Sequence, residues 1–73
     1  MQNQFQQAFD ALQMAWDQYF KAPHASEGQF RRWLCRYSLA TILAAFEHVS
    51  DVKWYSSTAL TREINATLAS VVE

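Results

Sequence analysis

Charge and cysteine are both scarce in this chain of 73 residues. It contains six basic and seven acidic residues, or 18% of the chain against about 25% in an average globular protein. Low charge combined with 51% apolar residues excludes an intrinsically disordered chain. A formal net charge of -1 provides no bulk attraction to nucleic acid or to anionic lipid. The single Cys35 excludes an internal disulfide, so the fold does not depend on oxidation.

The chain also lacks long apolar runs, linkers and internal repeats. Its longest apolar stretch, residues 39–46, is interrupted by Thr41 and falls far short of the roughly 20 residues that a membrane span needs. Residues 1–4 do not begin a basic segment followed by an apolar one, as a secretory signal would. We therefore expect a cytoplasmic protein that forms one small helical domain over residues 1–73.

Aromatic residues, in contrast, are plentiful, with five Phe, three Trp and three Tyr. A chain of this size buries only roughly 60% of the surface that its unfolded form exposes. Each aromatic side chain adds on the order of 150–250 Å² of surface to be covered. We expect part of that surface to remain exposed on a single chain, and large exposed apolar patches usually mark an interface. The composition therefore predicts a functional unit of more than one chain.

Helical periodicity is clear over residues 4–21. Apolar side chains recur there at steps of three and four, which places them on one face of a helix. This stripe consists of Phe5, Ala8, Phe9, Leu12, Ala15, Trp16, Tyr19 and Phe20. The residue before a proline is pushed out of the α region, so Ala22 and Pro23 should end the helix.

A second helix is predicted from Ser26 to about Glu47. Ser26 and Gln29 have the spacing of a capping box, in which each side chain satisfies a free backbone donor. The second half of this helix is apolar nearly all round, which is typical of an element buried on all sides. We interpret it as the central helix and expect Pro or Gly at Leu39 or Ile42 to unfold the chain.

A third helix is predicted from about Thr58 to Val72. Its threonines and valines have mediocre helix propensity, so packing must hold it in place. Its apolar stripe is Leu60, Ile64, Thr67, Leu68 and Val71. Because short connections favour antiparallel neighbours, we predict an all-α fold: a three-helix bundle, or an antiparallel helical hairpin with a docked third helix.

Arg31, Arg32 and Arg36 form the one cluster of like charge. Antiparallel pairing of the first two helices would place Asp17 near Arg31 or Arg32, and Asp10 near Arg36. The cluster would then make exposed structural ion pairs. Alternatively, it is a patch for an acidic partner or for phosphate, although three arginines are few for a nucleic-acid footprint.

Trp54 and Tyr55 lie in the connection before the third helix, flanked by Lys53 and two serines. Trp and Tyr dominate the hot spots of interfaces, and a connecting segment displays them more readily than a helix stripe does. The alternative is that Trp54 closes the end of the core. If the two residues form an interface, replacing both with alanine should weaken partner binding more than it lowers the melting temperature.

No motif indicates a metal, a cofactor or a reaction. His24, His48 and Cys35 match no metal-ligand spacing, so we expect no metal and no cofactor. We interpret Cys35 as a small buried thiol. The short loop around His24 offers no pocket to exclude water, and a nucleophile needs an oriented base. The sequence therefore predicts a protein that is not an enzyme.

A helix-turn-helix formed by the last two helices would need a recognition helix rich in Arg, Lys, Asn or Gln. The last helix offers Arg62 and Asn65, together with Glu63 and Glu73 of the wrong sign. Direct reading of DNA is therefore disfavoured.

The sequence favours a small, non-catalytic protein–protein interaction module. We expect it to act as a homo-oligomer, such as a homodimer, or as an accessory subunit bound to a larger complex. The candidate contact residues are Trp54, Tyr55, Arg31, Arg32 and Arg36. Two alternatives are a phage- or plasmid-type inhibitor that occludes a surface of a larger host machine, and a dimeric nucleic-acid-associated transcriptional regulator.

Overall fold

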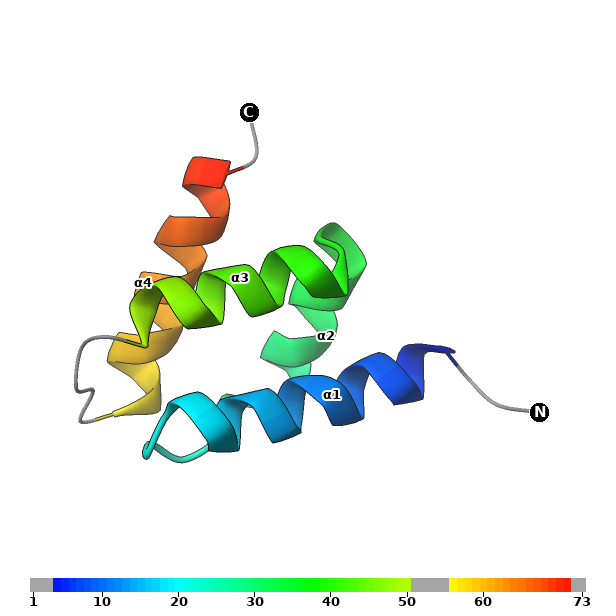
Figure 1. The fold of residues 1–73 in the computed structure, drawn as a ribbon, viewed down its shortest axis with the longest axis horizontal. Helices are drawn as coiled ribbons and strands as arrows, with labels where there is room; N and C mark the ends of the chain where they lie inside the picture. Colours follow the sequence, from blue (N-terminus) through cyan, green and yellow to red (C-terminus); the bar gives the residue numbers. More distant parts are fainter. Residues whose placement is uncertain (1–3, 51–55, 72–73) are drawn as a thin grey trace.

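The part of the chain that the structure describes folds into four helices and contains no strand (Figure 1). The structure is a computed structural model, and it describes residues 4–50 and 56–71. The helices are α1 (Gln4–Tyr19), α2 (Glu27–Arg36), α3 (Leu39–Val49) and α4 (Ser57–Val71). The predicted all-α class is confirmed. The predicted number of three helices is wrong, because the expected second helix is two separate helices.

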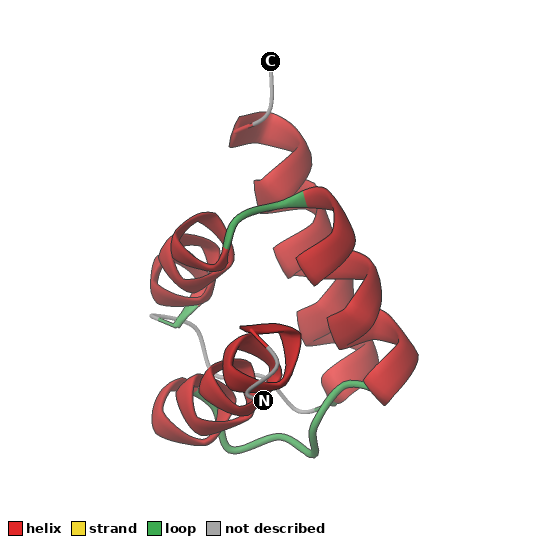
Figure 2. Ribbon diagram, turned by 90° about the vertical axis from the view of Figure 1, so that its right-hand side faces the viewer, coloured by secondary structure: helices red, strands yellow, loops and turns green. Residues whose placement is uncertain are grey.

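The helices cross one another and do not form the expected antiparallel hairpin (Figures 1 and 2). α1 and α3 run side by side in the same direction, and α2 and α4 run across them. The break after α2 lets the chain change direction, so that α3 runs alongside α1. As predicted, the segment that forms α3 is central, because α3 packs against each of the other three helices.

α1 ends close to its predicted boundary. Its buried residues, Leu12, Ala15 and Trp16, all belong to the predicted apolar stripe. Beyond the helix, the indole Nε1 of Trp16 donates a hydrogen bond to the Ala22 carbonyl at 3.0 Å. This bond holds the chain in place immediately before Pro23, where a helix cannot continue.

The predicted start of α2 is confirmed at Ser26. The Ser26 hydroxyl accepts the Gln29 backbone N–H at 3.1 Å, which satisfies one of the free donors of the first turn. Glu27 adds a carboxylate near the positive end of the helix dipole. α2 then directs Phe30 and Trp33 into the core.

The expected long helix breaks at Tyr37 and Ser38. Tyr37 (φ -132°, ψ 155°) and Ser38 (φ -71°, ψ 157°) both have extended backbone conformations. The Ser38 hydroxyl accepts the Thr41 backbone N–H at 3.2 Å and lies 2.8 Å from the Thr41 hydroxyl. Serine offers the backbone a local alternative to the helix, so this residue ends one helix and caps the next.

α3 is not buried on all sides, contrary to the expectation from its apolar composition. Ile42, Ala45, Phe46 and Val49 are buried. Ala40, Ala44, Glu47 and His48 are exposed. An exposed alanine leaves little apolar area in water, so two alanines on the outer face cost far less than a leucine or phenylalanine would.

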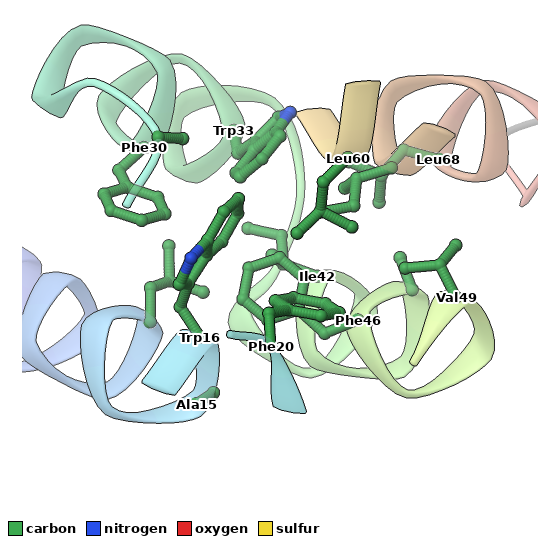
Figure 3. Close-up of a cluster of buried hydrophobic side chains, with 14 residues drawn as sticks. Ala15, Trp16, Phe20, Phe30, Trp33, Ile42, Phe46, Val49, Leu60 and Leu68 are labelled. Carbon is green, nitrogen blue, oxygen red and sulfur yellow. The ribbon is translucent and has the colours of Figure 1, made fainter. Parts of the chain in front are cut away.

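The core is built around aromatic rings packed mostly edge to face (Figure 3). The Trp16 ring lies 5.0 Å from that of Phe20 and 5.7 Å from those of Phe30 and Phe46, measured between centroids. The Trp33 ring lies 5.9 Å from that of Phe46. Such pairs add about 0.5–1.5 kcal/mol each to the energy of burying their area. Four of these residues come from three helices and Phe20 directly follows α1, so the rings tie α1, α2 and α3 together.

The fold covers more aromatic surface than expected. The nine aromatic side chains in residues 4–50 are all buried or half-buried. The exposed large apolar side chain among the described residues is Met14, at 72% exposure. The predicted surplus of exposed aromatic surface is therefore not found in this part of the chain, because four short crossing helices enclose more surface than three long ones in a line.

α4 starts one residue earlier than predicted and buries three residues of the predicted stripe. The Ser56 hydroxyl accepts the Ala59 backbone N–H at 3.2 Å and so caps the helix. Leu60, Ile64 and Leu68 are fully buried against the other helices. The C-terminal end of α4 projects beyond the rest of the bundle (Figure 1). No described helix has the length and hydropathy to span a membrane.

Candidate interaction surfaces

The arginine cluster lies on the outer face of α2. Phe30 and Trp33 point into the core and Leu34 packs partly against it, so the opposite side of this short helix faces solvent. Arg31, Arg32 and Arg36 are all exposed there, as the sequence predicted. The structure shows that these three arginines have different surroundings.

Arg31 is held in place by two neighbours. Its Nε donates to Oε2 of Glu27 at 3.0 Å, and its terminal nitrogen Nη2 lies 2.9 Å from the same oxygen. Its guanidinium carbon also lies 5.2 Å from the centroid of the Phe5 ring in α1, which is a cation–π contact. The charge of Arg31 is therefore largely satisfied within the chain.

The expected pairing between the aspartates of α1 and the arginines does not form. Oδ1 of Asp17 lies 2.7 Å from Nε2 of His24, in the loop that follows α1. Oδ1 of Asp10 accepts a hydrogen bond from Nε2 of Gln6, one turn earlier, at 3.0 Å. The prediction assumed antiparallel helices. Because α2 crosses α1, the two charged faces do not run alongside each other.

Arg32 and Arg36 consequently have no ion-pair partner among the described residues. They are four residues apart, so they are neighbours on the surface of α2. The interpretation of the cluster as structural ion pairs thus holds only for Arg31. Its partner is Glu27 of the same helix and not an aspartate of α1. The interpretation as a patch for an acidic partner remains open for Arg32 and Arg36.

The other predicted contact residues, Trp54 and Tyr55, lie outside the described residues. Their roles as interface or as core both remain predictions.

A groove between α3 and α4 was missed in the sequence. It has a volume of about 470 Å³ and is open to solvent. Its walls are Ala44, Ala45 and His48 of α3, with Glu63, Ala66, Thr67 and Ser70 of α4. The available signal was the presence of small residues on both helices: Ala44 and Ala45 on α3, and Ala66 and Ser70, four apart, on α4. Small residues in the sequence show that a helix has a face with short side chains. They do not show that the faces of two helices lie next to each other.

The groove places a serine, a histidine and a glutamate on its walls, which are the residue types of a catalytic triad. A triad requires that the base hydrogen-bonds both to the nucleophile and to the orienting carboxylate. No hydrogen bond joins Ser70, His48 and Glu63 to one another in the structure. Ser70 and Glu63 are also two helical turns apart on α4, or about 10 Å along its axis. The arrangement therefore does not support nucleophilic catalysis.

A second hollow, of about 300 Å³, lies between the first turns of α2 and α4. It is lined mainly by hydroxyl and amide side chains: Ala25, Ser26, Gln29, Ser57, Thr58 and Thr61. The Ser26 hydroxyl already caps α2. The hollow is thus the place where two capped helix ends meet.

Cys35 is exposed, so the prediction of a buried thiol is wrong. The cause is the break at Ser38, because it separates Cys35 from the buried face of α3 to which the expected continuous helix had joined it. Within residues 4–50 and 56–71, no three His, Cys, Asp or Glu side chains are grouped as a metal site would need.

Asn65, which sequence reasoning considered for contact with DNA, has a structural role instead. Its Oδ1 accepts a hydrogen bond from the indole Nε1 of Trp33 at 2.7 Å. This bond links α2 to α4, two helices that are 32 residues apart at these positions.

Comparison with known proteins finds no matching family model, no similar curated protein and no similar solved structure.

Proposed function

We propose that this chain is a non-catalytic, cytoplasmic protein-binding module that works as a homo-oligomer or as an accessory subunit of a larger complex. The observation that carries this proposal is the open groove between α3 and α4. Its walls are formed by small side chains, with His48 and Glu63 as its titratable residues.

The composition of the groove is suited to a protein partner. The cores of protein interfaces are depleted of charged residues relative to the rest of the surface. From Ile64 to the end of α4 there is no charged residue, and the same is true of α3 from Leu39 to Phe46. A partner can therefore cover this surface without desolvating many charges.

The shape of the groove also favours a protein partner over a small molecule. Small-molecule sites usually bury 70–90% of their ligand, roughly, in an enclosed and mainly apolar pocket. This groove is open, and alanine, threonine and serine give it low walls. Low walls let the backbone of a partner helix approach closely, because the distance between packed helices depends on the side chains at the contact.

The test is a native mass measurement of the protein isolated from its own cells. We expect the unmodified chain to be recovered at a fixed stoichiometry with a companion, either a second copy or another protein. Ala66→Arg places a long charged side chain in the groove and should abolish this association. Ala40→Arg is the matched control, since Ala40 is equally exposed on α3 but does not line the groove.

Two outcomes would contradict the proposal. One is a strict monomer without a companion, both from cells and after purification at high concentration. The other is equal loss of the companion in both variants, which would place the contact elsewhere. Circular dichroism of each variant shows whether it is folded, and arginine is a good helix former at both positions.

A further inference from the structure

We infer that the outer face of α2 is a docking site for an acidic helix of a partner protein, held by Arg32 and Arg36. This inference rests on the proposed role in protein binding, but it concerns a different surface from the α3–α4 groove. It follows from the different surroundings of the three arginines: Arg31 has an ion-pair partner among the described residues, whereas Arg32 and Arg36 have none.

The charge of this face is not cancelled within the described chain. Three of the six basic residues of the protein lie on the ten residues of α2, which carries one acidic residue, Glu27. Glu27 is already paired with Arg31. The aspartates of α1 contact His24 and Gln6 and do not reach α2. Arg32 and Arg36 are therefore left as two adjacent positive charges in solvent.

The surroundings of Arg32 leave room for a partner to approach. Its neighbours one turn away on the same face are Gly28 and Cys35, both exposed and both small. A Cβ atom built on Gly28 would have a single neighbour within 4 Å, the Ser26 hydroxyl oxygen at 3.9 Å. The backbone at Gly28 is therefore open to approach, one turn before Arg32 on α2.

The chemistry of this face fits carboxylates on a helix. A guanidinium group presents two parallel N–H donors that match the two oxygens of a carboxylate. Arg32 and Arg36 are one helical turn apart, and so are two acidic residues four positions apart on a partner helix. The two rows of side chains can then pair one to one, which fixes the register of the partner.

A nucleic acid fits the same face less well. Two available arginines form a small phosphate footprint, and the net charge of the whole chain is -1. Asn65 of α4, which could have read a base edge, is occupied by the indole of Trp33. The described residues thus offer no basic surface of the needed size, and Asn65 is not free to read a base.

The probe is a helical peptide of about fifteen residues that carries two glutamates four positions apart, together with a twin in which both are glutamine. Binding of the full-length protein is followed by fluorescence anisotropy at low and high salt. The buffer is reducing, since Cys35 is exposed. We expect binding to the glutamate peptide that weakens as salt rises, and little binding to the glutamine twin.

The variant Arg32→Gln with Arg36→Gln should bind the glutamate peptide about tenfold more weakly. Arg62→Gln, which changes an exposed arginine on α4, is the control and should bind as the unmodified protein does. Arg31→Gln should also keep most of the affinity, because this arginine is already engaged by Glu27 and Phe5.

Three results would overturn the inference: no binding to the glutamate peptide, equal binding to both peptides, or an equal loss of affinity in Arg62→Gln. Tighter binding to a short DNA duplex, lost in the Arg32 and Arg36 double variant, would instead assign this face to nucleic acid. None of these results depends on the groove. A companion that is lost in Ala66→Arg would keep the proposed function intact even if the α2 inference fails.

Discussion

A side-chain hydrogen bond joins α2 to α4, across 32 residues of the chain. Trp33 is fully buried, yet its indole nitrogen needs an acceptor, which the exposed Asn65 supplies from α4. A buried donor without a partner costs about 1–3 kcal/mol. Substitution of Asn65 should therefore be costly, although the residue is exposed. Sequence reasoning had no means of finding this pair, because nothing local links positions 33 and 65.

We predict that Asn65→Ala lowers the free energy of unfolding by about 1–3 kcal/mol, because it leaves the Trp33 N–H unsatisfied. Trp33→Phe removes the donor, and in that background Asn65→Ala should cost much less. The measurement is a double-mutant cycle by urea denaturation, with an expected coupling of at least about 0.5 kcal/mol. Additive effects of the two changes would show that the bond contributes nothing to stability.

At the scale of the helices, the caps were predictable and the long second helix was not. Ser26 was identified as a cap because it has the spacing of a capping box with Gln29. Ser38 was overlooked because it lies inside an apolar pattern that continues on both sides. This pattern was interpreted as one helix, whereas it belongs to two. A serine followed three residues later by a threonine was the local signal of the second start.

The revised helix boundaries change the expected effect of proline. Leu39 is the first residue of α3, where proline is tolerated because its missing N–H has no helical partner. Ser38 before it is already extended, as proline requires. Leu39→Pro should therefore unfold at nearly the same urea concentration as Leu39→Ala, its matched control for the lost side chain. Complete unfolding of Leu39→Pro would restore the continuous helix as the better description.

Ile42→Pro should behave differently. The Ile42 N–H donates to the Ser38 carbonyl at 3.1 Å, and proline would remove this bond and clash with that carbonyl. We expect Ile42→Pro to be less stable than Ile42→Ala by about 3 kcal/mol or more, measured by urea denaturation where both fold and by circular dichroism where one does not. Equal stability of the two variants would contradict the helical hydrogen bond from Ile42 to Ser38, and with it the start of α3 at Leu39.

At the scale of the whole molecule, stability depends on one core that is rich in aromatic rings. The described residues include no buried polar or charged side chain. A domain of 73 residues has a stability of roughly 4–11 kcal/mol. The loss of one central ring therefore removes a large share of the total.

Phe46→Ala should destabilise the protein by about 3–5 kcal/mol, because Phe46 is fully buried and contacts the rings of Trp16, Phe20 and Trp33. The measurements are thermal unfolding and near-ultraviolet circular dichroism, which reports the packing of the aromatic side chains. Met14→Ala, at the exposed position on α1, is the control and should change stability by less than about 0.5 kcal/mol. A Phe46→Ala variant that melts like the control would show that this ring is not part of the core.

The sequence by itself determined the all-α class, the apolar stripes of α1 and α4, and the helix starts near Ser26 and Ser57. These features depend on contacts within a few residues, so the local pattern contains them. The tertiary structure decided that α2 crosses α1, and with it which charges meet. Among the described residues, Arg32 and Arg36 then have no ion-pair partner, and α3 packs against α4 with a groove between them. Crossing angles depend on how side chains from distant segments pack, and the order of residues along a helix does not record that packing.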